Sequence, residues 1–123
     1  MSRYFSYDSD KMLACSCGCN TKGMEPAFLD LMDQIRDAVG EPLTVTSGYR
    51  CPKHNAKVSS TGSSGPHTTG RAIDIKADSR LRFLLIQAAL RQGITRIGVA
   101  DSFIHLDSLG ELDGFPSPRV WVY

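Results

Sequence analysis

Hydrophobic residues recur at steps of three and four positions in two segments of the chain, and this spacing predicts two amphipathic helices. The first helix is expected from Pro26 to Gly40, because proline favours the first helical position and glycine commonly ends a helix. The second is expected from Ser79, as its N-cap, to about Gln92, with Gly93 ending it. The positions expected to face the core are Phe28, Leu31, Met32, Ile35 and Val39 in the first helix and Leu81, Leu84, Leu85, Ala88 and Ala89 in the second.

Shorter apolar stretches, several of them alternating with polar residues, predict β-strands. They lie at residues 42–47, 71–76, 95–99, 102–108 and 119–123. A short helix is expected over 52–58, and residues 59–66 (SSTGSSGP) predict either a flexible tip or a shaped active-site loop. Two helices and about five strands indicate a single α+β domain over residues 1–123, with a small, largely antiparallel sheet. The Cys-containing segment 1–23 would pack on this domain or be loosely attached to it.

The composition is that of a globular protein and points away from several classes of partner. The 123 residues suffice for one domain, with 41% hydrophobic and 22% charged residues. A formal net charge of +1 gives no reason to expect nucleic acid, and no apolar run approaches the roughly 20 residues of a membrane span. The start, MSRYFSYDSDKML, lacks the apolar core of a secretory signal, so we expect synthesis in the cytoplasm without a signal peptide. The even charge and small size favour a monomer.

Alternation within two of the strands points to a metal site. Asp74 lies between Ile73 and Ile75, where a carboxylate is costly unless its charge is compensated. If strands 71–76 and 102–108 pair, Asp74 and His105 share a face, and His67 approaches from the turn before the first strand. Two imidazoles and one carboxylate, with a fourth position open for water, suit a catalytic zinc site. Taken singly, each residue also has an ordinary explanation, as a surface histidine or a solvated aspartate.

Three segments of the sequence resemble the zinc D-alanyl-D-alanine carboxypeptidase family. They are SGYRCPKHN (47–55), PHTTGRAIDI (66–75) and FIHLD (103–107). That family includes bacterial cell-wall peptidases and many phage or prophage endolysin-like proteins, and it shares its fold with the hedgehog signalling domain. The resemblance covers about residues 25–123, so it implies a fold of the hedgehog/DD-peptidase type.

The resemblance implies roles for individual residues. The implied zinc ligands are His67, Asp74 and His105. Arg50 would bind a substrate carboxylate or stabilise the developing oxyanion, although a surface salt bridge is its ordinary role. Tyr49 would flank the cleft, and Ser64 is a candidate substrate contact.

The sequence departs from the family pattern at the general base. Members often carry Glu or Asp three residues before the distal histidine, and here that position is Ser102, which cannot act as a base. Asp107 is the first candidate for this role and Asp101 the second, because either carboxylate could take a proton from the attacking water. The alternative for Asp107 is to orient a ligand histidine. His54 lies in a matching segment and is expected to pack or cap rather than to act in catalysis.

The cysteines allow three interpretations. Cys15, Cys17 and Cys19 form a C-x-C-x-C run, and Cys51 stands apart. A disulfide from Cys51 to one member of the run would staple the N-terminal segment onto the domain. A cysteine-bound metal is the second interpretation, although zinc sites usually have two or more residues between paired cysteines. Four reduced thiols are the third.

The sequence therefore predicts a zinc metallopeptidase that hydrolyses an amide bond in peptidoglycan peptides with a zinc-activated water, as a carboxypeptidase or an endopeptidase. Its expected place of action is the bacterial cell wall, after phage lysis or as a virion component. The alternative is a catalytically silent, zinc-containing cell-wall-binding or virion structural module, which Ser102 favours. A third possibility, a cysteine-ligated zinc protein, predicts metal retention after His105→Ala.

Overall fold

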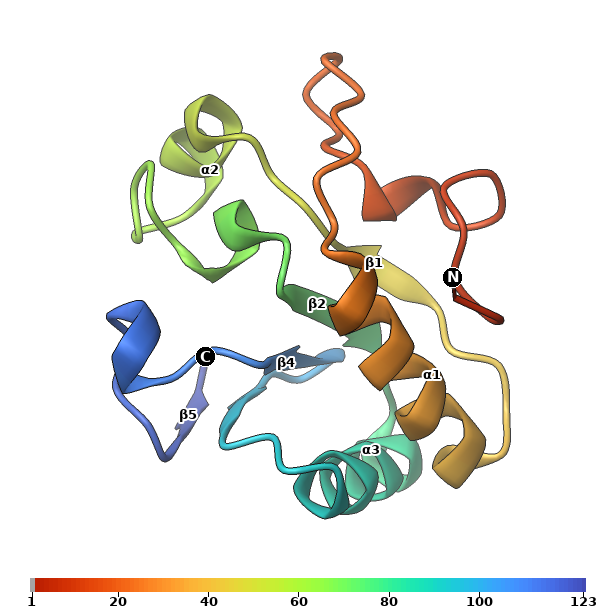
Figure 1. Ribbon diagram of the computed structural model, residues 1–123. Coiled ribbons are helices and arrows are strands. Elements are labelled where there is room, and N and C mark those ends of the chain that lie inside the picture. The colour runs from red at the N-terminus through yellow and green to blue at the C-terminus, as the bar shows by residue number, and fades with distance from the viewer. Residues whose placement is uncertain (1) are drawn as a thin grey trace.

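The helices and strands of the computed structural model, which describes residues 2–123, follow the predicted order (Figure 1). Its helices are α1 (Pro26–Val39), α2 (Pro52–Val58) and α3 (Ser79–Arg91), with short 3₁₀ turns η1 (Lys11–Leu13), η2 (Pro66–Thr69) and η3 (Glu111–Asp113). Its strands are β1 (Val45–Ser47), β2 (Ala72–Lys76), β3 (Arg96–Val99), β4 (Phe103–Asp107) and β5 (Arg119–Val122). Each predicted strand is present but is shorter by one to three residues, and the short helix over 52–58 has the predicted bounds.

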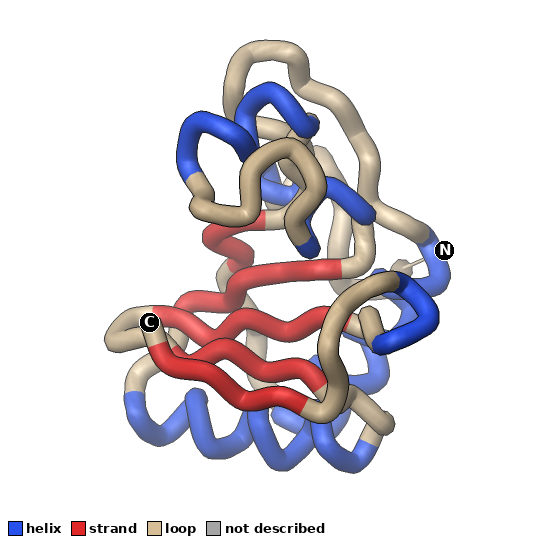
Figure 2. Tube along the Cα trace, turned by 90° about the vertical axis from the view of Figure 1, so that its left-hand side faces the viewer, coloured by secondary structure: helices blue, strands red, loops and turns tan. Residues whose placement is uncertain are grey.

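The five strands of residues 2–123 form one sheet in the order β1-β2-β4-β3-β5. Neighbouring strands are antiparallel except β3 and β5, which are parallel. Helices α1 and α3 pack against each other and against one face of this sheet (Figures 1 and 2). The predicted α+β class with a small, largely antiparallel sheet is therefore confirmed.

The helix-covered face of the sheet is apolar. Ile73 and Ile75 of β2 lie opposite Leu106 and Ile104 of β4, and all four side chains are fully buried. The helix residues packed on them are Phe28, Leu29, Met32 and Ile35 of α1 and Leu85, Ala88 and Ala89 of α3. Because side chains alternate along a strand, the polar residues of β2 and β4 are left on the opposite face.

The ends of the two main helices show one correct prediction and one correction. Gly40 follows α1 in the left-handed conformation, with φ of 80°, as predicted. The predicted cap of α3 is wrong by one residue, because the Asp78 carboxylate accepts the Leu81 N–H at 2.8 Å and Ser79 is already helical. A carboxylate satisfies the free amide and also interacts with the positive end of the helix dipole, which a hydroxyl cannot match.

Residues 2–23 pack against the sheet and α1. Leu13 is fully buried, and the amides of residues 48–49 donate to the carbonyls of Met12 and Leu13 at 2.8 and 2.9 Å. The carboxylate of Asp33, on α1, accepts hydrogen bonds from residues 2–4. The N-terminal segment is thus attached to the domain at two separate places.

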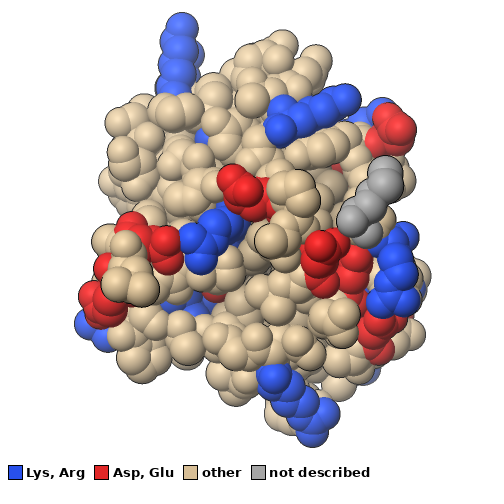
Figure 3. All heavy atoms as spheres, viewed as in Figure 1, with Lys and Arg blue, Asp and Glu red and all other residues tan. Residues whose placement is uncertain are grey.

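The surface carries charges of both signs. On the face shown in Figure 3, acidic and basic side chains are interspersed rather than gathered by sign. The helices within residues 2–123 are too short or too polar to span a bilayer.

Candidate metal centre

Three side chains that can ligate a metal come together on the polar face of the sheet. Asp74 of β2 and His105 of β4 are direct cross-strand neighbours, and His67 approaches from η2. Asp74 Oδ1 lies 2.9 Å from His105 Nδ1 and 3.3 Å from His67 Nε2. All three residues are at most 5% exposed, and their ligand atoms lie within 4.8 Å of one another. The strand alternation that suggested their convergence is therefore present in the fold.

A tight turn before β2 positions His67. Pro66 begins η2, and Gly70 ends it in the left-handed region with φ of 77°. The Gly70 carbonyl accepts the Glu25 N–H at 2.9 Å, so two chain segments meet here at backbone contact distance. A Cβ at Gly70 would lie 2.1 Å from the Gly23 carbonyl oxygen, so the close approach requires glycine.

We expect Gly70→Ala to lower the free energy of unfolding by on the order of 3 kcal/mol, because it combines backbone strain with a clash against main-chain atoms. Gly93→Ala is the matched control, since Gly93 has a similar φ of 83° with open space around its Cβ position. Its expected cost is about 1 kcal/mol. Urea unfolding followed by circular dichroism measures both, and equal midpoints would contradict the close approach of residues 23 and 70.

The outer nitrogen of each imidazole is held by an acceptor, so this nitrogen carries a proton. His67 Nδ1 donates to the Gly48 carbonyl at 2.7 Å, and His105 Nε2 donates to Asp107 Oδ2 at 2.7 Å. The inner nitrogens, His67 Nε2 and His105 Nδ1, point at Asp74 Oδ1, where each can donate a proton to the carboxylate or, without that proton, offer a lone pair to a metal ion. Histidines that bind metals are typically held in this way through the nitrogen that does not touch the metal.

The carboxylates give this cluster a preference for positive charge. Burial alone would raise the pKa of Asp74, but hydrogen bonds from His105 and His67, together with their charge, hold that pKa well below its usual range. Burial alone would lower the pKa of His105, yet its hydrogen bonds to Asp107 and Asp74 raise it. The same electrostatics that retain a proton on His105 favour a cation among these side chains.

The cluster lines a cleft of about 550 Å³. Arg50 lines it too: its Nη1 donates to Asn55 Oδ1 at 3.0 Å, and its Nη2 lies 3.9 Å from Asp74 Oδ2. Residues 59–61 of the Gly/Ser-rich loop form part of the wall, so this loop belongs to the cleft. The aromatic lining residues are Phe103, Phe115, Trp121 and Tyr123. The cleft therefore combines a fixed cation, apolar walls and a metal-ligand set.

The sequence matches a known family of proteins. The family described as Peptidase M15 matches residues 4–107, a range that includes His67, Asp74 and His105. The chain belongs to the M15 peptidase family. M15 peptidases are zinc-dependent, so membership of the family indicates a zinc-dependent peptidase. A search among curated proteins gives no match.

The donor set of this M15 peptidase fits a zinc ion. Zinc binds imidazole nitrogen and carboxylate oxygen at about 2.0–2.2 Å in tetrahedral geometry, which separates neighbouring ligand atoms by roughly 3.4 Å. The distances from Asp74 Oδ1 to the two imidazole nitrogens, 2.9 and 3.3 Å, are close to that value. Three protein ligands is also the usual number in catalytic zinc sites.

Asp107, for which the sequence left two roles open, is fully buried and lies outside the lining of the cleft. Its Oδ1 accepts from Arg96 Nε at 2.8 Å and from the Leu109 N–H at 3.2 Å, while its Oδ2 accepts from His105. Both oxygens are therefore engaged inside the protein. This geometry favours the orienting role over the role of general base in the M15 peptidase.

The other predicted site residues have no contact with the cluster. Asp101, like Ser102, lines a different hollow from the cleft. Tyr49 packs its ring against Gly23, and Ser64 is exposed outside the cleft lining. The structure thus brings Arg50 to the cluster, whereas a base at residue 101 and substrate contacts at residues 49 and 64 remain predictions.

The sequence analysis missed the groups on β3 and β5 that complete the site. Arg96 is 6% exposed, and its guanidinium carbon lies 4.9 Å from the centre of the Trp121 ring. That ring lies 5.3 Å from the His105 ring, in space that a side chain at Gly98 would fill, since a Cβ there would come 2.7 Å from Trp121 Nε1. A charged residue within an apolar strand was the signal that pointed to Asp74. The same signal could have pointed to Arg96 in this M15 peptidase.

Proposed function

We propose that this M15 peptidase hydrolyses an amide bond in the peptide part of bacterial peptidoglycan, as a DD-carboxypeptidase or an endopeptidase. The observation that carries the proposal is the position of Arg50, whose guanidinium lies 3.9 Å from the carboxylate of Asp74 in the same cleft. A guanidinium binds a carboxylate bidentately and, in a shielded site, stabilises the charge of a tetrahedral intermediate. The resemblance of three sequence segments to zinc D-alanyl-D-alanine carboxypeptidases supports the substrate class.

The roles within this proposal follow from the contacts. The side chains that would hold the zinc ion are His67, Asp74 and His105. Zinc, when bound, acidifies a water molecule and polarises a carbonyl group. Arg50 binds the substrate carboxylate or the developing oxyanion, and its Nε and Nη1 are held by Ser47 and Asn55 at 3.3 and 3.0 Å. The aromatic lining places apolar side chains beside the reacting groups, and a bound substrate that covers them would exclude water and strengthen these electrostatic interactions.

Asp107 acts in this proposal as a positioning residue for His105. Asp107→Asn removes the charge that pairs with the buried Arg96 and holds His105 Nε2. We expect zinc affinity to fall about 10- to 100-fold and the free energy of unfolding to fall by about 3 kcal/mol or more. Zinc titration against a competing chelator and kcat at saturating zinc separate the two roles. A base would show unchanged zinc affinity with a large loss of kcat, and this result would contradict the positioning role.

Asp101→Asn is the matched control for that experiment, because Asp101 is exposed and lies outside the cleft. It should leave both zinc affinity and kcat near the wild-type values. A large loss of kcat in this variant would instead identify Asp101 as the base, which was the second prediction from the sequence.

Zinc binding at this site is expected to depend on pH. The pKa of His105 is raised, so the ion must displace a proton from it. Apparent affinity should therefore fall as the pH decreases below that pKa, by about tenfold per pH unit for one displaced proton, and should level off above it. Trp121, the sole tryptophan, lies with its ring 5.3 Å from that of His105, so its fluorescence reports on this site. A pH-independent affinity would contradict the prediction.

The alternative function, a zinc-containing binding module without catalysis, has one specific observation in its favour. Among the described residues that line the cleft, Asp74 is the sole carboxylate, and it is a proposed zinc ligand. A carboxylate free to act as general base is therefore not among them. Such a module would bind peptidoglycan fragments and leave them intact.

Mass spectrometry of muropeptides incubated with the purified protein tests the proposal against this alternative. We expect loss of a terminal D-residue or cleavage of a cross-link, and no reaction after treatment with a chelator. Intact fragments that co-purify with the zinc-loaded protein would support the binding module instead. The mass of the products also distinguishes a carboxypeptidase from an endopeptidase.

We also propose that the protein acts on the bacterial cell wall as a monomer, in phage lysis or as part of a virion. The resemblance to endolysin-like family members supports this place of action. Isolated sacculi, incubated with the protein and then washed, should release peptide fragments, and sedimentation should give the mass of one chain. Sacculi that remain unaltered while soluble muropeptides are cut would contradict action on the intact wall.

A further inference from the structure

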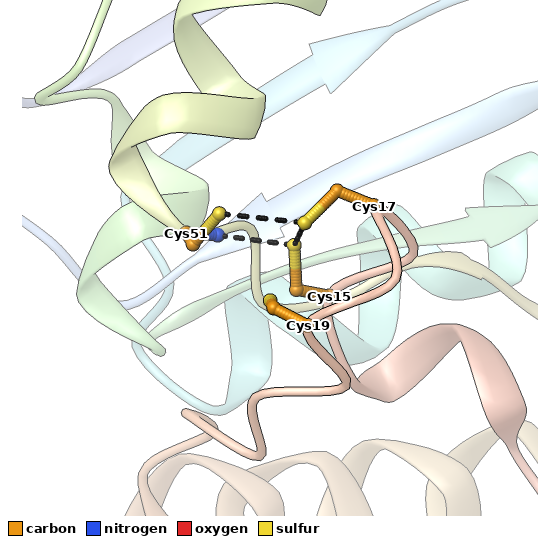
Figure 4. Close-up of side chains that lie close together, drawn as sticks. All are labelled: Cys15, Cys17, Cys19 and Cys51. Atoms are coloured by element: carbon orange, nitrogen blue, oxygen red, sulfur yellow. Dashed lines mark hydrogen bonds between the residues drawn. The ribbon is translucent and has the colours of Figure 1, made fainter.

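The four cysteines of the chain gather at one place (Figure 4). None of them lines the peptidase cleft. Cys17 Sγ lies 3.5 Å from Cys15 Sγ and 3.7 Å from Cys51 Sγ. All four sulfur atoms lie within 4.8 Å of one another. Four thiolates at about 2.3 Å from a tetrahedral zinc ion are roughly 3.8 Å apart, so the observed spacing matches a four-cysteine zinc site.

A hydrogen-bonded loop brings the cysteines of the C-x-C-x-C run close together, although their spacing in the sequence is unusual for a zinc site. In an extended strand, alternate residues are roughly 6.8 Å apart, too far for three of them to share one ion. Here the Cys15 N–H donates to the Thr21 carbonyl at 3.0 Å and closes a loop. Gly18 and Asn20 within it have φ of 107° and 52°. The chain therefore curls and turns its cysteine side chains toward Cys51, as Figure 4 shows.

Hydrogen-bond donors already point at the sulfur atoms. Cys15 Sγ accepts the Cys51 N–H at 3.3 Å, and Cys51 Sγ accepts the His54 N–H at 3.4 Å. Cys19 Sγ accepts from the Thr21 hydroxyl at 3.2 Å. Donors of this kind stabilise thiolates and orient them around a metal ion.

We propose that the four cysteines form a second, structural zinc site. Binding forms four Zn–S bonds and releases the four thiol protons to solvent, so no oxidant is required. The resulting centre carries two net negative charges, and Lys53 and Lys57, which line the same hollow, offset them. The four cysteines are free, and the sulfur distances of 3.5 and 3.7 Å around Cys17 are well above the roughly 2.05 Å of a disulfide bond, whereas they match thiolates that share one ion.

The site ties the N-terminal segment to the chain beside the proposed substrate-binding arginine. Cys51 directly follows Arg50, whose N–H donates to the His67 carbonyl at 3.1 Å. Fixing Cys51 to the loop that carries Cys15 therefore holds the segment between β1 and α2 on one side, while the bond from Arg50 to His67 of η2 holds it on the other. This inference does not depend on the substrate that is proposed for the cleft.

Metal analysis of the full chain purified with a reductant tests the proposal. We expect two zinc ions per chain in the wild type, and one in Cys17→Ser and in His105→Ala. Cys17 is chosen because it is exposed, which limits the effect of the substitution on folding. Cobalt loading provides a second readout, since a thiolate-to-cobalt charge-transfer band should be present in the wild type and in His105→Ala and weakened in Cys17→Ser.

One zinc per wild-type chain, without the thiolate band, would overturn the proposal. So would a chain whose intact mass, measured without reductant, shows the hydrogen loss of a disulfide and which binds no second ion after reduction. The cobalt spectrum of the wild type decides the question even if Cys17→Ser fails to fold. Loss of metal at the His–Asp–His cluster alone would count against the peptidase site and leave this inference standing.

Discussion

Replacing His105 with alanine is expected to lower zinc-dependent peptide hydrolysis by about a thousandfold or more. The substitution removes one proposed zinc ligand and leaves Asp74 and Asp107 without the imidazole between them. A zinc ion contributes several kcal/mol to transition-state stabilisation, and each 1.4 kcal/mol corresponds to about tenfold in rate. Initial rates on a muropeptide, at saturating zinc, measure the loss.

The control for this experiment is His54→Ala. His54 lies on α2, its Nε2 contacts Ser16 Oγ at 3.3 Å, and it is outside the lining of the peptidase cleft. Its activity should stay within about twofold of the wild type, as surface substitutions away from a site usually do. Because unpaired buried carboxylates also destabilise the fold, circular dichroism must confirm that His105→Ala is folded at the assay temperature. A folded His105→Ala variant with wild-type rates would remove the cluster from the mechanism.

Arg50→Ala is expected to lower kcat/KM by about a hundredfold or more, the usual cost of removing a group that stabilises an oxyanion. Arg50→Lys should recover little of this loss, because an ammonium group cannot form the paired hydrogen bonds of a guanidinium. Arg80→Ala is the matched control: Arg80 pairs with Glu41 on the surface at 2.8 Å and lines a different hollow. Steady-state kinetics on one muropeptide compares the three variants.

A substrate with an amidated C-terminus separates the two roles proposed for Arg50. If Arg50 binds the free carboxylate, wild type and Arg50→Ala should cut the amidated substrate at similar, low rates. If it stabilises the oxyanion, the variant should remain far slower on both substrates. Wild-type kcat/KM in Arg50→Ala on both substrates would leave Arg50 with no more than a structural role.

The features that the sequence could predict are those set by local periodicity. The apolar steps from Phe28 to Val39 require a helix with one buried face, whatever the rest of the chain does. The Asp74 carboxylate lies on the face of the sheet opposite to Ile73 and Ile75, where it needs a partner for its charge. His105 alternates in the same way with the apolar residues of β4 and lies directly across from Asp74. Alternation alone therefore brought the two residues together.

The features that could not be predicted depend on pairing between distant segments. The surroundings of Asp107 become clear from β3, where Arg96 is its direct neighbour across the sheet. The residues of β4 itself do not indicate that Arg96 is the partner of Asp107. Likewise, the position of the Tyr49 ring beside Gly23 depends on how the N-terminal segment packs, which the sequence around Arg50 does not indicate. The cysteine loop, closed by a backbone hydrogen bond between residues 15 and 21, is a further feature that spacing alone conceals.

Anomalous diffraction from zinc-soaked crystals, recorded at the zinc absorption edge, tests the account most directly. We expect a strong peak in contact with His67 Nε2, Asp74 Oδ1 and His105 Nδ1, in the cleft that Arg50 also lines. A map with no peak among these three side chains, in crystals of the folded protein, would contradict the central claim.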